Sequence, residues 1–81
     1  MEMFPTLSEK QVALVRAKFN TGIVLDEMFS YAITKEQKVY SFFDSLEEAS
    51  HFAQKILSEK NDVEIIVYDL EEKLLSYLKP K

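Results

Sequence analysis

The sequence has no cysteine, only one histidine and only one glycine among its 81 residues. Without cysteine, the chain has neither disulfides nor thiolate metal ligands. A single glycine excludes the glycine-rich loops that hold phosphate groups. A Ser-His-Asp arrangement would depend on His51 alone, which we expect on the exposed side of a helix. These absences predict a protein that is not an enzyme and binds no cofactor.

Long apolar runs are also absent. No stretch approaches the roughly 20 apolar residues of a membrane helix, and residues 1–5 lack the basic start and apolar core of a secretory signal. Together with the lack of disulfides, this predicts a cytoplasmic protein without a membrane partner. Hydrophobic residues make up 47% of the chain, which is enough for the core of one small domain over residues 1–81.

The only glycine predicts a β-hairpin. Asn20-Thr21-Gly22 reads as a three-residue loop with the glycine in the left-handed conformation, which pairs residues 12–19 with 23–30. This register sets Arg16 opposite Asp26 on a solvent face. It places one set of apolar residues together on the core face: Ala13, Val15, Ala17, Phe19, Ile23, Leu25, Phe29, Tyr31 and Ile33.

Two further features concern the first half of the chain. A capping box at 6–9 leaves a helix over about 7–19 as the alternative to the first strand. A polar loop over 34–37 predicts a second hairpin, in which aromatic residues pair on the same core face: Tyr31 with Tyr40, and Phe29 with Phe42. The opposite face then carries apolar residues with no assigned cover: Leu14, Val24, Met28, Val39 and Phe43.

The second half begins with the strongest helix signal. Ser45-Leu46-Glu47-Glu48 is a capping box that starts an amphipathic helix ending near Asn61. Residues 63–68 are β-branched and apolar, as in a covered strand. Residues 70–79 favour a short helix, with a strand over 74–78 as the alternative. Together, the predicted segments give an α+β, two-layer sandwich with the element order βββαβα, in which the first three strands form an antiparallel meander.

Glu48 and His51 have the spacing found in half of a di-iron carboxylate site. Such sites need a second copy of this motif and two more glutamates on facing helices. The sequence holds one copy, and Glu48 already has a capping role. We therefore expect no metal site.

Surplus apolar surface predicts a small protein-binding domain, such as an adaptor, an inhibitor, or an immunity- or antitoxin-like protein. The partner would be another protein, including a second copy of the chain. The residues expected at this interface are Leu14, Met28, Val39, Phe43, Glu47 and Glu48. The alternative is weak binding of single-stranded nucleic acid through a mildly basic, partly aromatic face formed by Arg16, Lys18 and Phe43.

Overall fold

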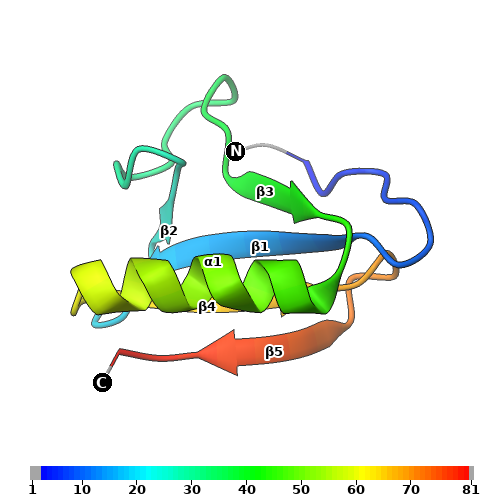
Figure 1. Cartoon of the computed structure of the whole chain (residues 1–81). Coiled ribbons are helices and arrows are strands. Elements are labelled where there is room, and N and C mark those ends of the chain that lie inside the picture. The colour runs from blue at the N-terminus through cyan, green and yellow to red at the C-terminus, as the bar shows by residue number, and fades with distance from the viewer. Residues whose placement is uncertain (1–2, 81) are drawn as a thin grey trace.

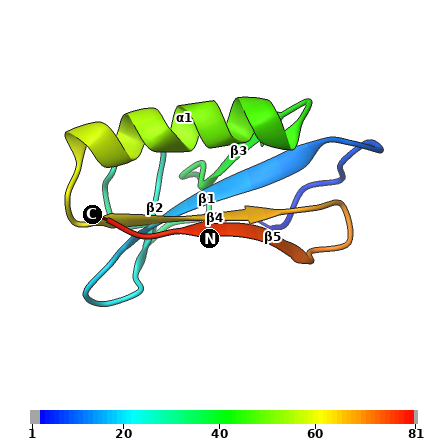
Figure 2. The same ribbon diagram turned by 60° about the horizontal axis from the view of Figure 1, so that its bottom comes forward.

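Five strands and one helix form the part of the chain that the computed structural model describes, residues 3–80 (Figure 1). The elements are β1 (Val12–Lys18), β2 (Val24–Leu25), β3 (Tyr40–Phe43), α1 (Leu46–Glu59), β4 (Val63–Tyr68) and β5 (Leu74–Leu78). All strand pairs are antiparallel. The helix lies across one face of the sheet (Figure 2), so the predicted α+β class with an antiparallel sheet is confirmed.

Strand β1 is the centre of the sheet and pairs along both of its edges. β4 occupies one edge over nearly the whole length of β1. The other edge is shared: β3 pairs with the first half of β1, from Val12 to Val15, and β2 pairs with Arg16 and Ala17. β5 pairs with β4 and forms the outer edge. A β-bulge interrupts the β4–β5 register at the start of β5.

The core lies between α1 and the sheet. Alternate residues of β4 are buried toward the helix, as expected for a strand with a period of two. The buried residues of this cluster are Val12, Leu14, Leu25, Ala49, Ala53, Ile56, Leu57, Val63, Ile65 and Val67. The predicted cap holds the start of the helix, since the Ser45 hydroxyl accepts a hydrogen bond from the Glu48 backbone N–H at 3.1 Å.

The first hairpin has a strand over Val12–Lys18, as preferred over the helix, but its register differs from the prediction by one residue. Lys18 N–H donates to the Ile23 carbonyl at 2.9 Å, and Gly22 N–H donates to the Lys18 carbonyl at 2.7 Å. The loop therefore has four residues, 19–22, although Gly22 has the expected positive φ of 74°. Since a slip of one residue exchanges the two faces of a strand, Leu14 joins the core.

The predicted second hairpin is wrong. Between Asp26 and Val39 the chain makes no regular strand, only an isolated bridge from Leu25 to Tyr31. Gln37 holds the loop instead: its Oε1 accepts from Ile33 N–H at 2.7 Å, and its Nε2 donates to Asp26 Oδ2 at 2.7 Å. β3 pairs with β1 rather than with residues 29–33, so the strands do not form the predicted meander.

The predicted C-terminal helix is also wrong, and the alternative strand is the correct reading. Asp69 Oδ1 accepts hydrogen bonds from the N–H groups of Glu71 (2.8 Å) and Lys73 (2.9 Å). Glu72 has a positive φ of 60°. The acidic residues thus close a turn instead of capping a helix, and the following apolar run pairs with β4.

Arg16 is the most deeply buried charged residue among residues 3–80. Its partners across the sheet are Leu25 and Ile65, both in the core, so its side chain starts on the helix-facing side. It is 1% exposed, and its Nη2 donates to the Ser41 hydroxyl. Burial lowers the pKa of Arg16, while the charges of Glu27 and Asp26 oppose this shift. Within residues 3–80, Nη1 has no hydrogen-bond acceptor.

Asp26 organises the loop that follows β2. Its Oδ1 accepts from the N–H groups of Met28 and Ser30, both at 2.9 Å, and its Oδ2 accepts from Gln37. The Gln37 hydrogen bond is the largest of several causes, including Arg16, that lower the pKa of Asp26. This carboxylate therefore connects the loop to the buried cation.

The turn at Gly22 gives the first prediction. Gly22→Val should lower the free energy of unfolding by more than about 1 kcal/mol, because a β-branched residue resists positive φ. Nothing lies within 4 Å of an added Cβ, so the loss measures backbone strain alone. Gly22→Asn is the matched control, since asparagine tolerates this conformation. Urea unfolding checks both variants, and equal stability of wild type and Gly22→Val would refute the turn.

Asp26 gives a prediction for pH. Its pKa is lower in the folded state, so its stabilising contribution is present above its unfolded pKa of about 4 and is lost as pH falls through the folded value. Asp26→Asn should reduce stability at pH 7 and flatten the decline between pH 5 and pH 2. Glu36→Gln removes an exposed carboxylate of the same loop as the control. An acid limb unchanged in Asp26→Asn would show that Asp26 is uncoupled from folding.

Candidate protein-interaction surface

β5 is an open sheet edge with apolar side chains. It pairs only with β4 among the described strands, so its outer row of backbone groups faces away from the sheet. Leu74 is 61% exposed and Tyr77 is 48% exposed, with Leu75 also exposed. The Tyr77 hydroxyl donates to Glu64 Oε1 at 2.6 Å, which raises the pKa of Tyr77. An open edge of this kind is a template for pairing with another strand.

The apolar surface continues from β5 to the start of α1. Three exposed leucines, Leu46, Leu70 and Leu75, line one hollow of 350 Å³ between the helix start, the β4–β5 turn and residues 10–12. Lys10, Asp44 and Asp69 also line this hollow. The edge strand and its neighbours thus gather five of the large exposed apolar side chains of the described chain: Leu46, Leu70, Leu74, Leu75 and Tyr77.

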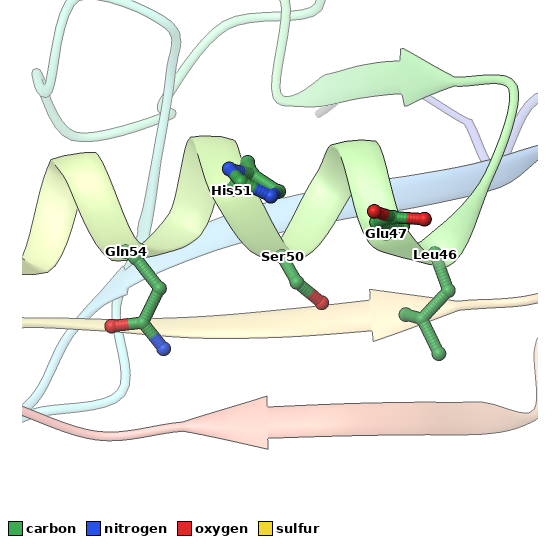
Figure 3. A pocket seen from close by; sticks show the side chains of 5 residues that line it. All are labelled: Leu46, Glu47, Ser50, His51 and Gln54. Atoms are coloured by element: carbon green, nitrogen blue, oxygen red, sulfur yellow. The ribbon is translucent and has the colours of Figure 1, made fainter.

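Most of β5 lies outside the core, and Leu78 is the residue of this strand that packs against it. α1 packs on β1, β3 and β4, and in both views β5 lies beside this layer (Figures 1 and 2). Leu46, Ser50 and Gln54 extend from α1 toward the β5 side, whereas Glu47 and His51 lie on the outer surface of the helix (Figure 3). These five residues line an open groove of 690 Å³. This flank of α1 therefore borders an open groove on the side of the helix where β5 lies.

A second groove follows the other flank of α1. The rings of Phe43 and Phe52 lie 5.1 Å apart at an angle of 45°, and charged residues surround them in a hollow of 550 Å³. At the end of the helix, Lys60 Nζ lies 4.7 Å from the ring centre of Phe29, which has a positive φ of 63°. The rings of Phe43, Phe52 and Phe29 therefore already contact side chains of the same chain.

The residues predicted for partner binding do not form one patch. Leu14 is buried because the register of β1 turns it toward the helix, and Val39, directly before β3, is also buried. Met28 is 81% exposed in the loop after β2. The other three gather on one groove: Phe43, half-buried against Phe52, with the exposed Glu47 and Glu48. The predicted outer face is therefore wrong for Leu14 and Val39.

The residues of the nucleic-acid alternative are separated as well. Arg16 is buried. Lys18 pairs with Asp62, and this hydrogen bond raises the pKa of Lys18 and lowers that of Asp62. Phe43 packs on Phe52. Arg16 and Lys18 are therefore not available together as contacts for phosphate groups, and no observation favours nucleic-acid binding.

His51 is exposed on α1 and lines grooves with Glu47, as the sequence predicted for the outer side of the helix. Among residues 3–80, no three histidine, aspartate or glutamate side chains are grouped so that they would hold a metal ion. No helix in the described part is long and apolar enough to cross a membrane.

Sequence reasoning missed the importance of Leu74, Leu75 and Tyr77 because it assigned them to a helix. The available signal was the alternative strand over 74–78. Even with a strand over 74–78, the sequence does not identify this strand as the edge of the sheet. The order of the strands depends on the pairing of β1 with β4, which are distant in sequence.

Comparisons with protein-family models, with curated proteins and with solved structures found no match to this chain. The geometry of the surface is therefore the only basis for a functional proposal.

The Tyr77–Glu64 contact gives a third prediction. The folded pKa of Tyr77 is raised, so its contribution to stability is present below the unfolded pKa of about 10 and is lost as pH rises through the folded value. Tyr77→Phe should lower the melting temperature by a few degrees at pH 7 and lessen the decline above pH 10. Tyr31→Phe, at another exposed tyrosine, should behave like wild type. Identical alkaline melting curves for all three proteins would contradict a role for this contact.

Proposed function

We propose that this chain is a small, non-catalytic protein-binding domain that acts as an adaptor, an inhibitor, or an immunity- or antitoxin-like protein. One observation carries the proposal: the open edge of β5 carries exposed apolar side chains, and further exposed leucines lie next to it at the start of α1 and in the β4–β5 turn. Contiguous apolar surface of this kind is typical of interaction sites. An extended segment of a partner would pair with the edge while its side chains contact the leucines.

Charge supports one kind of partner. The chain has a net charge of −4, and Glu47 and Glu48 lie exposed next to Leu46 at the start of α1. Acidic side chains at the rim of an apolar surface increase the association rate with a basic protein. A partner with an apolar strand flanked by lysine or arginine fits this surface best.

Capture from a nuclease-treated lysate of the source organism tests the proposal. The immobilised wild-type chain should retain one protein in near-stoichiometric amount. Leu74→Lys should lose at least 10-fold of it, because the charge enters the apolar surface of the edge. Leu74 is 61% exposed, so the substitution leaves the core intact.

Ile33→Lys is the matched control. Ile33 is 82% exposed in the loop after β2, and β2 lies at the opposite end of the strand order from β5. This variant should retain the partner like wild type. A monomeric wild-type chain that retains no protein, or equal loss in both variants, would refute the proposed function at this surface.

A further inference from the structure

We propose that a hollow on the sheet face away from α1 binds a trimethylammonium group, carried by a small molecule or by a trimethylated lysine side chain. The hollow has a volume of 210 Å³, and three aromatic rings line it, those of Phe4, Tyr40 and Tyr68, together with the carboxylate of Glu72. Aromatic rings attract quaternary ammonium groups, and a carboxylate adds a charge of opposite sign. None of the exposed leucines of β5 lines this hollow, so such binding would be additional to the proposed protein contact.

The strand pairing places the two tyrosines on the same face of the sheet. Val15 pairs with Tyr40 of β3 along one edge of β1, and Ala13 pairs with Tyr68 of β4 along the other. Paired residues share a face, and Ala13 and Val15 alternate with Leu14, which packs in the core under α1. Tyr40 and Tyr68 therefore stand on the face away from α1, one on each side of β1.

Phe4 supplies the third ring. Its ring centre lies 5.4 Å from that of Tyr40 at an angle of 77°, and 6.1 Å from that of Tyr68 at an angle of 86°. Rings at nearly right angles form the walls of a corner instead of a flat stack. Pro5 holds the backbone of Phe4 in an extended conformation. The start of the described chain thus joins β3 and β4 across β1 through aromatic contacts.

The remainder of the hollow is apolar, because Val15, Val24 and Val39 line it. An unmodified ammonium group brings three N–H donors and a tightly held hydration shell, and an apolar wall satisfies none of these donors. A trimethylammonium group has no N–H donor and presents methyl groups to the valines. Sites for drug-sized ligands enclose roughly 300–1,000 Å³, so this smaller hollow suits one headgroup or the end of one side chain.

Glu72 gives the hollow its charge. It lies exposed in the turn between β4 and β5, with a positive φ of 60°. Within residues 3–80 its carboxylate takes part in no ion pair or hydrogen bond, since the neighbouring Lys73 lies 4.0 Å from Glu71 instead. No lysine, arginine or histidine of the described chain lines the hollow. The carboxylate is therefore available to a cation, and its attraction should weaken as salt is added.

Nuclear magnetic resonance titration with choline tests the proposal. Choline added up to about 50 mM should give saturable shifts at Tyr40, Tyr68 and Val15, because contacts of this strength bind in the millimolar range. The compound 3,3-dimethylbutanol has the shape of choline without its charge and should bind at least about 5-fold more weakly.

A second pair of probes identifies the carrier of the group. The methylamide of N-acetyl-trimethyllysine should bind at least about 5-fold more tightly than its unmethylated counterpart, which has N–H donors to satisfy. Tighter binding of the trimethyllysine probe than of choline assigns the hollow to a modified protein side chain. The reverse order assigns it to a free small molecule.

Two variants locate the binding in the hollow. Glu72→Gln should weaken choline binding at least about 3-fold because the charge is lost, whereas Glu71→Gln, one residue away in the same turn and outside the hollow, should bind like wild type. Tyr68→Leu should weaken binding about 5-fold because it keeps an apolar side chain but removes the ring. Tyr31→Leu, at an exposed tyrosine elsewhere, is its control. Circular dichroism checks that all four variants are folded.

Three results would overturn the inference: no saturable choline shifts at the residues that line the hollow, equal binding of choline and 3,3-dimethylbutanol, or equal losses in Glu72→Gln and Glu71→Gln. Any of them would leave the capture of a protein through the β5 surface untouched, since Leu74 lies outside the hollow. Loss of that capture would likewise leave choline binding as a separate measurement.

Discussion

The burial of one cation, Arg16, determines how the first half of the chain is arranged. An ion taken out of water costs several kcal/mol even after the protein relaxes around it, so acceptors and counter-charges must approach it. They come from Ser41 on β3 and from Asp26 and Glu27 after β2. The segment between β2 and β3 is therefore tied to the central strand by electrostatics and hydrogen bonds. Arg16 also distinguishes the two faces of β1, because a slip of one residue would move the charge to the opposite side of the sheet.

Local signals predicted the elements better than their pairing. The Ser45 cap, the apolar stripe of α1 and the β-branched run of β4 each lie within a few residues, and all three were predicted correctly. The left-handed conformation of Gly22 was also predicted correctly. A glycine in a loop does not, however, determine whether the loop has three or four residues. The second hairpin failed because Gln37 and Asp26 form a hydrogen-bonded loop that competes with strand pairing. The tail failed because Asp69 accepts hydrogen bonds in a turn as readily as at a helix start.

The candidate surface was harder to predict than the fold. Glu47 and Glu48 are exposed as expected, since the helix wheel depends on local spacing alone. Leu14 was misplaced because exposure in a sheet depends on register, which changes faces with each residue. Val39 was misplaced because its position was taken from the second hairpin, which does not form. The open edge at Leu74 and Tyr77 depends on strand order, which is a property of contacts distant in sequence. Lys18 had an unforeseen partner for the same reason, since Asp62 lies in the turn before β4.

The pairing of β1 with β4 also constrains how the chain can fold during its synthesis. About 45 residues separate the two strands, and closing such a loop costs entropy before any contact forms. At a translation rate of about 5–20 residues per second, β1 waits roughly 2–9 s for its main partner. During this interval only the short β2 and β3 are available to it, and Arg16 stays hydrated until the helix and β4 arrive. The nascent protein thus keeps its central apolar strand without its main partner for several seconds.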